Sequence, residues 1–522
     1  MRRYDAIVIG GGVNGLVCAA VLAKAGRRTV VLEARDQVGG GAATSELAPG
    51  FRVPTLAHRT GPLRRDVVAE LQLASHGLTF IDSPVDVTAL APGGGGLTIY
   101  RDAARTADGL RARSPKDAEA WPRFVQTRAA LGGVVGSLLD GPPPPIDAPG
   151  AQDLWRALKT LRRFRGLPTQ EAYRLLRWGP MAVADLVAEC FETELLRAAV
   201  AADGIFGTMF GPWSAGSGMA LLLGAGNEAL AAPGSHVVAG GPGALADALA
   251  AAVTRAGGEV RTGTRVAQVR VDDERARGVV LEDGTEIAAG VVVSGLHPKR
   301  TLLDLCDPVH LPPEFLWRLR NYRSHGTVAK LNLALSALPT IPGVDREALT
   351  GRVRIGPDID YLERAFDHAK YGRFSTAPWL EFTIPSLLDR SLAPEGAHVL
   401  SAYVQFAPYH LRDTTWEVQA APLRDATLAV LEQYAPGLGG LIVAGEVITP
   451  LDLEQQWGFT GGHIFHGELA LDQLLMMRPL LGTGHYRTPI DGLFLCSSGT
   501  HPGTGLTGGA GLLAGRQIAR DR

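Results

Sequence analysis

The chain has 522 residues, of which 46% are hydrophobic and 20% charged, as in a soluble globular protein with a large core. Its 51 basic and 53 acidic side chains give a formal net charge of −2, so no overall positive field indicates a nucleic-acid partner. The four cysteines are too far apart for a CxxC redox pair or a zinc site, which excludes a disulfide reductase of that type and predicts no metal. Free cysteines, and the lack of an apolar run of about 18 residues, predict a cytoplasmic protein without a transmembrane segment.

The first forty residues carry a dinucleotide-binding pattern. An apolar strand at residues 6–9 leads into Gly10-x-Gly12-x-x-Gly15, followed by a helix of small residues and a second apolar strand at 29–32. In this pattern the first glycine allows a tight turn, the second lets the backbone approach a pyrophosphate, and the third lets helix and strand pack closely. The helix N-terminus offers N–H groups to the phosphates. Glu33 follows the second strand, where its carboxylate can accept a hydrogen bond from a ribose hydroxyl.

A second glycine cluster after Glu33 helps to choose between NAD and FAD. Ala34 and Arg35 are followed by the run from Gly39 to Ala42, which resembles the FAD-binding extension of flavoprotein oxidases and desaturases. Simple NAD dehydrogenases usually lack this cluster. In many of these flavoproteins an arginine follows the glycine pair, whereas this chain has Gly41, so a charged contact is lost and the backbone contacts remain. The cluster therefore predicts FAD as the cofactor.

Three separated segments, residues 1–95, 236–300 and 485–522, are predicted to form one FAD-binding domain. In the second segment, the glycine-rich run 240–243 opens an alanine-rich helix at 244–256, which precedes strands at 259–271 and 290–294. This run lacks the spacing of a second dinucleotide site, so it predicts a helix N-terminus rather than a site for NADPH. The third segment contains a strand at 492–496 and a closing helix from about 509 to 520.

The remaining segments, 96–235 and 301–484, are predicted to form a substrate-binding domain. Residues 110–200 show helical periodicity interrupted by a proline run at 142–145, which predicts an extended loop, and residues 326–337 and 379–406 are typical of strands. The predicted fold class is α/β, or α+β overall. A Rossmann-like FAD-binding domain is assembled from discontinuous segments, and a mixed sheet with a helical cap covers the flavin.

The stretch PIDGLFLCSSGTHPGTG at residues 489–505 is a further distinctive motif. It resembles the flavin-contacting end of phytoene desaturases and related carotenoid oxidoreductases. Segments near residues 40 and 240, and the stretches 379–411 and 449–479, extend the resemblance over nearly the full length. The chain is thereby identified as a member of the phytoene-dehydrogenase superfamily, in the branch named for pyridine nucleotide-disulfide oxidoreductase domain-containing protein 2. The resemblance implies an amine-oxidase-like flavoprotein that acts as an FAD oxidoreductase, and it implies no particular substrate.

The resemblance also implies roles for single positions. The first glycine motif holds the pyrophosphate, Glu33 binds the adenosine ribose, and the backbone of Val266 reads the adenine edge. Gly499 passes close to the phosphates or the ribityl chain, and Leu506 and Thr507 direct N–H groups toward the flavin N1/O2 edge. There a helix N-terminus stabilises the negative charge of the reduced ring. The expected cofactor-binding residues are Gly10, Gly12, Val13, Asn14, Gly15, Glu33, Ala34, Arg35, Gly40, Gly41, Ala42, Val266, Gly499, Leu506 and Thr507.

Two histidines are the candidates for catalysis. His466 lies between Gly462 and Gly467, which favour close backbone approach, and an imidazole exchanges protons near neutral pH. His501 lies in the predicted flavin-end turn, where it can orient the isoalloxazine. For both residues, a structural role in a turn is the alternative. Further candidates for the pocket lining, with core packing or a turn as the alternative, are Tyr403, Gln405, Tyr409 and His463.

The predicted function is that of an FAD-dependent dehydrogenase, desaturase or oxidase. It would transfer a hydride from a small or lipophilic organic substrate to flavin N5. The alternatives are a flavin-bearing interaction protein with little catalysis and a redox-neutral flavin isomerase. The expected electron acceptor is oxygen, a quinone or another protein. The arginine-containing helical region at 154–178 is a candidate for peripheral membrane contact, with a solvated helix face as the alternative.

Overall fold

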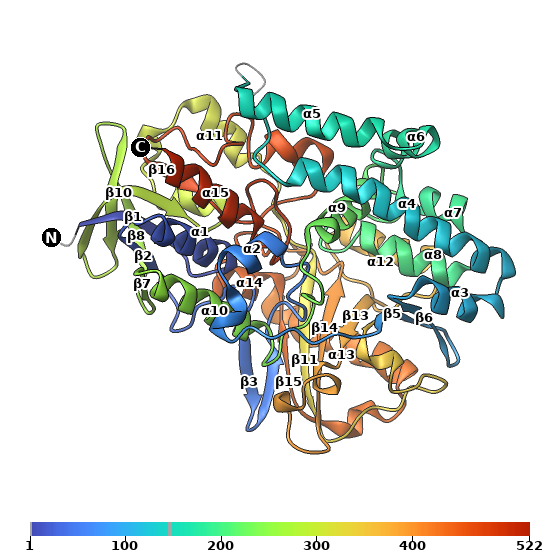
Figure 1. Ribbon diagram of the computed structural model, residues 1–522. Helices are drawn as coiled ribbons and strands as arrows, with labels where there is room; N and C mark the ends of the chain where they lie inside the picture. Colours follow the sequence, from blue (N-terminus) through green and yellow to red (C-terminus); the bar gives the residue numbers. More distant parts are fainter. Residues whose placement is uncertain (1–2, 145–148, 522) are drawn as a thin grey trace.

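Two seven-stranded sheets and a two-stranded sheet organise the computed structural model within the residues that it describes, 3–144 and 149–521 (Figure 1). The first sheet has the strand order β7-β2-β1-β10-β9-β8, and β16 pairs with β10. The contacts of β1 with β2 and β10, of β2 with β7, and of β10 with β16 are parallel. The strands are β1 (Arg3–Ile9), β2 (Thr29–Leu32), β7 (Glu259–Arg261), β8 (Val266–Asp272), β9 (Arg275–Leu281), β10 (Glu286–Ser294) and β16 (Leu493–Leu495).

Three helices pack with this sheet: α1 (Val13–Lys24), α10 (Pro242–Arg255) and α15 (Gly509–Arg520). Small residues let α1 and α15 come close, because a Cβ on Gly511 would lie 2.0 Å from the carbonyl oxygen of Asn14. The first and last helices of the chain therefore lie side by side, as Figure 1 shows in blue and red. The predicted assembly of a Rossmann-like unit from sequence-distant segments is confirmed.

One predicted strand in this unit is wrong in detail. Residues 259–271 form two strands, β7 and β8, which lie at opposite edges of the sheet. Gly263, with φ +60°, occupies the turn between them, a left-handed conformation that glycine adopts without strain. The polar run RTGTR at residues 261–265 marks this break in the sequence.

The second sheet has the order β15-β11-β14-β13-β12-β5-β6. Its contacts are antiparallel except for the parallel pair β12–β5, so it is a mixed sheet, as expected. Because β5 belongs to this sheet, the expected boundary of the nucleotide domain at residue 95 is wrong for residues 85–95. The strands are β5 (Val85–Leu90), β6 (Gly96–Tyr100), β11 (Val328–Leu335), β12 (Arg352–Ile355), β13 (Trp379–Thr383), β14 (His398–Gln405) and β15 (Ile442–Ile448).

Helices surround the second sheet. The cap consists of α3 (Ala103–Arg111), α4 (Pro115–Leu139), α5 (Ala151–Arg165), α6 (Thr169–Trp178), α7 (Val183–Cys190), α8 (Glu194–Ala201) and α9 (Ser217–Leu230). The expected extended run at 142–145 falls between α4 and α5, and its residue 145 lies outside the described residues. The other helices are α2 (Arg65–Glu70), α11 (Pro313–Arg320), α12 (Ile359–Lys370), α13 (Trp416–Tyr434) and α14 (Pro450–Gln455).

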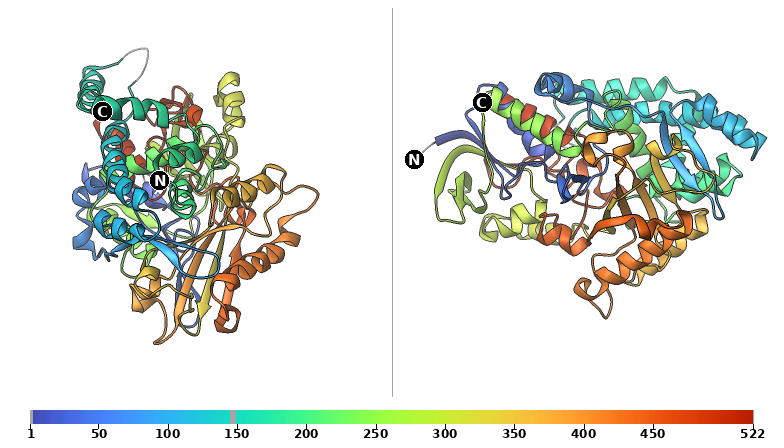
Figure 2. Two further views of the ribbon diagram at one scale, coloured as in Figure 1. Left: turned by 90° about the vertical axis from the view of Figure 1, so that its right-hand side faces the viewer. Right: turned by 90° about the horizontal axis from the view of Figure 1, so that it is seen from below.

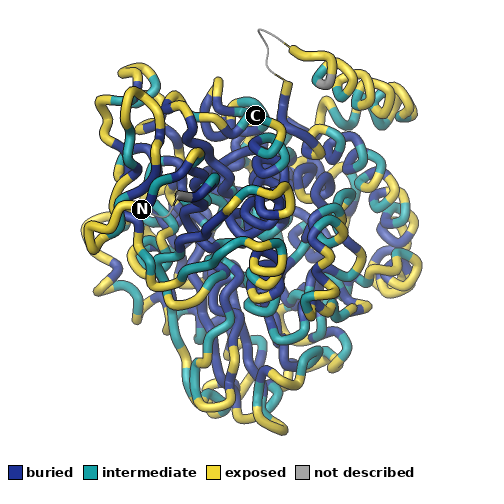
Figure 3. Tube along the Cα trace, turned by 60° about the vertical axis from the view of Figure 1, so that its left-hand side comes forward, coloured by how far each residue is buried: buried dark blue, intermediate teal, exposed yellow. Residues whose placement is uncertain are grey.

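The buried residues form separate apolar clusters around the two sheets. One cluster joins α1, α10 and α15, and another joins the second sheet to α13, which lies beside it in Figure 2. Figure 3 shows the buried residues, in dark blue, gathered in the interior of the molecule. The two-stranded sheet, β3 (Thr44–Ala48) with β4 (Phe51–Pro54), leads the chain from the nucleotide motif toward the second sheet. Among the helices that the structure describes, none combines the length and apolar character needed to cross a bilayer.

Candidate active site

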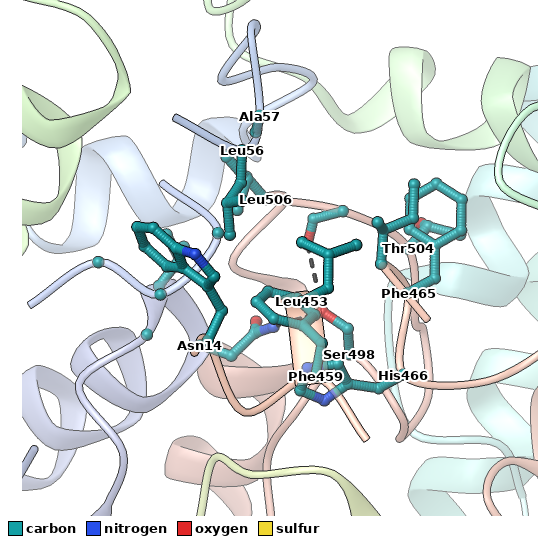
Figure 4. Close-up of a pocket in the computed structure, with 18 of the residues that line it drawn as sticks. Asn14, Leu56, Ala57, Leu453, Phe459, Phe465, His466, Ser498, Thr504 and Leu506 are labelled. Atoms are coloured by element: carbon teal, nitrogen blue, oxygen red, sulfur yellow. Dashed lines mark hydrogen bonds between the residues drawn. The ribbon is translucent and has the colours of Figure 1, made fainter. Parts of the chain in front are cut away.

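One continuous cavity of about 700 Å³ runs from the N-terminal glycine motif to the second sheet. Residues from both ends of the chain meet in it. Figure 4 shows Leu56 and Ala57 next to Leu506, with Asn14, Ser498 and His466 below them. Such a cavity is of the size typical of small-molecule sites.

The nucleotide end of the cavity is built by the turn before α1 and by the residue after β2. The Glu33 carboxylate accepts hydrogen bonds from the backbone N–H groups of Gly11, at 2.6 Å, and Arg35, at 2.9 Å. Within the described residues, no side chain caps the N-terminus of α1, which leaves its positive end toward the cavity. A Cβ on Gly12 would meet nothing within 4 Å, so open space lies next to this backbone.

A second part of the cavity is built by the start of α15. The Asn14 side chain accepts a hydrogen bond from the N–H of Gly511 and donates one to Oγ of Ser498, both at 3.2 Å. Asn14 thereby ties the first turn of α1 to the first turn of α15. Leu506 and Thr507, just before α15, line the cavity. The N-cap residue of α15 is Gly508, and side-chain oxygens of Thr507 and Asn14 accept hydrogen bonds from the N–H groups of Gly509 and Gly511 in its first turn.

All of the expected cofactor-binding residues line this cavity except Ala42 and Gly499. The side chain of Ala42 is buried, and its N–H closes a turn on the carbonyl of Gly39 at 3.0 Å. Gly499 packs against Pro298, whereas its neighbour Ser498 reaches the cavity. The glycine patterns identified the two loops, but not which residue of each loop faces inward.

Comparison with known proteins decides the family. The model of the flavin-containing amine oxidoreductases matches residues 14–521. The chain belongs to this family. This flavin-containing oxidoreductase is 36% identical to pyridine nucleotide-disulfide oxidoreductase domain-containing protein 2 of Rattus norvegicus, over 99% of this chain and 94% of that protein. It is 29% identical to the phytoene desaturase (lycopene-forming) of Pantoea ananas, over 96% of each.

Solved structures agree with the fold of this flavin-containing oxidoreductase. Wild-type putrescine oxidase bound to putrescine matches with a TM-score of 0.60 and 17% identity, over 100% of this chain and 99% of that one. The expected superfamily, fold and FAD cofactor are confirmed. The residues present also fit FAD. The Gly12 backbone leaves room for a pyrophosphate, Glu33 offers a carboxylate to a ribose, and Leu506 and Thr507 lie at the second helix N-terminus.

His466 lies on the cavity wall of the oxidoreductase, near Phe459 and Ser498 in Figure 4. Its backbone has φ +55°, a left-handed conformation that is uncommon for residues other than glycine and marks functional sites. Among the described residues, no group bonds its buried Nδ1. Burial, with the nearby Arg478 cation, lowers the pKa of His466 to about 4, so the imidazole is neutral at pH 7.

The other five sequence candidates divide between the cavity lining and positions outside it. Tyr403 lines the cavity, but His501 does not: it is buried, and its Nε2 lies 2.9 Å from the carbonyl oxygen of Gly141. Gln405 is buried and accepts a hydrogen bond from the N–H of Gly207, and the Tyr409 hydroxyl bonds Glu454. His463 also lies outside the lining, where its Nδ1 accepts a hydrogen bond from the N–H of Phe465 at 3.2 Å.

Arg478 connects several loop segments through hydrogen bonds, a role that the sequence did not reveal. Its fully buried guanidinium donates to backbone carbonyls on both sides of it, including that of Phe465 at 2.8 Å and that of Ser498 at 2.9 Å. It also bonds the carbonyls of Gly467 and Glu468. This arginine therefore holds the loop of His466 against the turn that precedes Leu506.

The wall of the cavity at the second sheet is charged, which sequence reasoning also missed. Glu381 accepts a hydrogen bond from Nε of Arg354 at 2.7 Å, and Asp203 accepts one from Nη2 of Arg354 at 2.6 Å. Arg352 adds ion pairs to Asp203, at 3.3 Å, and to Glu381, at 3.5 Å. Two features of the sequence indicated this charged wall. Arg352 and Arg354 alternate in one strand, which places both on the same face, and Glu381 interrupts the apolar strand WLEFT.

Lys330 and His58 continue this wall. Lys330 lies in the buried, mainly apolar strand β11, and its Nζ lies 3.3 Å from Nδ1 of His58 and 4.2 Å from the centre of the Tyr403 ring. Nε2 of His58 lies 3.3 Å from Oε1 of Glu381. Burial holds the pKa of Lys330 well below its usual range, and burial together with Lys330 lowers the pKa of His58 to about 3.

Proposed function

We propose that this chain is an FAD-dependent dehydrogenase or oxidase of a small organic substrate that binds between the flavin end of the cavity and the charged wall. The continuity of the cavity supports this function, because it joins the nucleotide motif to a space lined by titratable groups. When bound, FAD supplies the two-electron acceptor that such an oxidation needs. The family match supports an oxidoreductase and leaves the substrate open.

In this proposal the protein orients the substrate, excludes water and receives a proton. His466 is neutral at pH 7 and lies at the cavity wall, so its imidazole can accept the proton that a substrate N–H or O–H loses during oxidation. Phe465 and Ile464 from the same loop also line the cavity and exclude water there. His501 keeps no catalytic role in this proposal, because its Nε2 is engaged with Gly141 away from the cavity.

The identity of the electron acceptor and the cytoplasmic location stay predictions. Both alternative functions also remain testable. A flavin-bearing interaction protein would hold FAD without being reduced by any small molecule, and an isomerase would act only with reduced flavin and without net oxidation of its substrate.

Anaerobic reduction of the flavin tests this function. The purified protein is expected to carry FAD and to lose its visible absorbance on addition of a substrate from a panel of amines, alcohols and acids. His466→Asn is expected to slow this bleaching at least about tenfold, because asparagine tolerates the left-handed backbone but has no basic imidazole. His410→Asn, a change at an exposed histidine outside the cavity, serves as the control. A protein that stays colourless after reconstitution with FAD would contradict the function.

A further inference from the structure

Two arginines that line the cavity, Arg59 and Arg128, have longer ion-pair distances than Arg352 and Arg354 of the charged wall. Arg59 approaches Asp86 only to 3.6 Å, and Arg128 approaches Asp203 only to 3.7 Å. Within the described residues, neither guanidinium makes a side-chain hydrogen bond. Both line the cavity and are partly buried, with 16% and 29% of their side chains exposed. A guanidinium presents a fork of N–H donors that matches a carboxylate.

The carboxylates of the same wall are already engaged. Each carboxylate accepts a hydrogen bond or contacts a cation or histidine at hydrogen-bonding distance. Within the described residues, the groups of this wall that still lack a close partner are therefore donors rather than acceptors. The contacts are Asp86 with Arg352 at 3.0 Å, Asp203 with Arg354 at 2.6 Å, Glu381 with Arg354 at 2.7 Å, and Glu228 with His236 at 3.2 Å.

The two arginines also face one region. Arg59 lies two residues after Ala57, which Figure 4 places next to Leu506 at the expected flavin end. Arg128 comes from α4 in the helical cap and lines the same cavity. Both cations help to lower the pKa of Glu228, although burial alone would raise it, so both act on this one carboxylate. Apolar side chains complete this part of the lining: Phe206, Leu223 and Ile464.

We propose that Arg59 and Arg128 form an anion subsite, which binds a carboxylate of the substrate while the apolar body of the substrate extends toward the flavin. This inference rests on the proposed function and narrows its substrate class to organic acids, amino acids included. A hydrocarbon leaves both guanidiniums without an acceptor, and a diamine adds like charge next to them.

Titration of the FAD-loaded protein tests the subsite with three probes that share a carbon skeleton: hexanoate, hexanamide and hexylamine. Perturbation of the flavin absorbance reports binding near the ring. Hexanoate is expected to bind at least about tenfold more tightly than hexanamide or hexylamine. Arg59→Met and Arg128→Met are each expected to weaken the binding of hexanoate at least about tenfold and to leave the binding of hexanamide unchanged. Arg59→Lys keeps the positive charge but loses the forked arrangement of donors. Its affinity for hexanoate is therefore expected to lie between those of wild type and Arg59→Met.

Arg270→Met is the matched control, because this arginine is 34% exposed and lies on β8 outside the cavity lining. The melting temperature and flavin content of each variant show that it is folded and loaded. Tighter binding of hexylamine, no response to hexanoate, or equal hexanoate affinity in wild type and both methionine variants would overturn the subsite. Loss of the proposed function is a separate result, in which the wild-type protein holds no reducible flavin.

The hairpin of α5 and α6 carries a second, independent feature. Leu154, Trp155, Leu158 and Leu161 form one stripe along α5, and between 48% and 66% of each residue is exposed. The face of α5 that is less exposed carries polar residues such as Asp153 and Arg156. In Figure 1 the hairpin lies at the edge of the molecule, and Figure 3 shows α5 largely exposed. Apolar stripes of this kind mark surfaces that bind a partner or a membrane.

The basic charges of α5 favour an anionic surface as the binding partner of this stripe. The helix has five basic residues and one acidic residue, and Lys159, Arg162, Arg163 and Arg165 are exposed beside the stripe. A tryptophan and leucines next to basic side chains are typical of helices that lie in the plane of a bilayer. We also infer that the α5–α6 hairpin binds the surface of an anionic lipid bilayer, which develops the expected peripheral membrane contact.

Co-sedimentation with vesicles tests this surface. The full-length protein is expected to bind phosphatidylcholine vesicles that contain phosphatidylserine and to be released by high salt. The double variant Trp155→Gln/Leu158→Gln is expected to lose this binding. Trp317→Gln, which alters a comparably exposed tryptophan on α11, is expected to keep it. No binding by the wild type, or a dimer in size-exclusion chromatography that the double variant dissociates, would overturn the inference, because a second copy would then cover the stripe.

Discussion

Gly15→Ala is expected to abolish FAD retention and to destabilise the protein. The added Cβ would lie 2.1 Å from the carbonyl oxygen of Gly10, a distance that real Cβ atoms do not show. The turn and α1 must therefore separate, which removes the close packing that holds the pyrophosphate-binding backbone. Overpacking of this kind costs about 1–3 kcal/mol of the free energy of unfolding. Flavin absorbance after gel filtration and urea unfolding of the cofactor-free protein measure the two effects separately.

Gly12→Ala is the matched control for this prediction. Its φ of −71° suits alanine, and the new Cβ would meet nothing within 4 Å in the protein itself. The variant is therefore expected to unfold at the same urea concentration as the cofactor-free wild type, yet to lose FAD affinity, because its methyl group enters the space assigned to the pyrophosphate. Full FAD retention by Gly12→Ala would contradict this assignment.

Glu381→Gln is expected to destabilise the protein by about 3–5 kcal/mol, the usual cost of removing one partner of a buried ion pair. Glu381 is 4% exposed and bonds Arg354, which is itself 2% exposed. Burial alone would raise its pKa, but Arg354, Arg352 and His58 hold the pKa of Glu381 well below its usual range. Its stabilisation is therefore complete above the unfolded pKa of 4.5 and is lost as the pH falls below that value.

Glu347→Gln provides the comparison, because Glu347 pairs with Arg105 where both side chains are more than 40% exposed. Such a pair contributes about 0–1 kcal/mol. Urea unfolding at pH 7 measures both variants. At a pH below 4 the difference between Glu381→Gln and wild type is expected to narrow, since the wild-type carboxyl is then protonated in the unfolded chain. Equal losses in the free energy of unfolding for the two variants at pH 7 would show that the stability of the charged wall does not depend on Glu381.

The sequence was most informative where function depends on local backbone geometry. The motif from Gly10 to Gly15 requires glycines at fixed spacing, and Glu33 follows directly from the end of the second strand, so both could be identified from the sequence, and the structure places both at the cavity. The start of α15 was predicted for the same reason. Ala42 and Gly499 mark the limit of this reasoning, because spacing identifies a loop but not which of its residues faces the cavity.

The charged wall could not be assembled from the sequence. Arg59, Arg128 and Asp203 come from a loop, a cap helix and a short turn, and each resembles one of the many charged residues of an ordinary surface. Only the tertiary packing of the cap on the second sheet brings them together. Lys330 and Glu381 could have been noticed, because a charged residue within a buried apolar strand needs a partner.

The pairing of α1 with α15 also has a consequence for biosynthesis. β16 and α15 lie within the last 30 residues of the sequence, and α15 supplies the helix N-terminus assigned to the flavin ring. During translation these residues leave the ribosome long after the turn that follows β1. A nascent chain that still lacks α15 can therefore form the turn assigned to the ADP part of FAD, but it cannot yet close around the isoalloxazine. Complete capture of FAD is a step that follows the synthesis of α15.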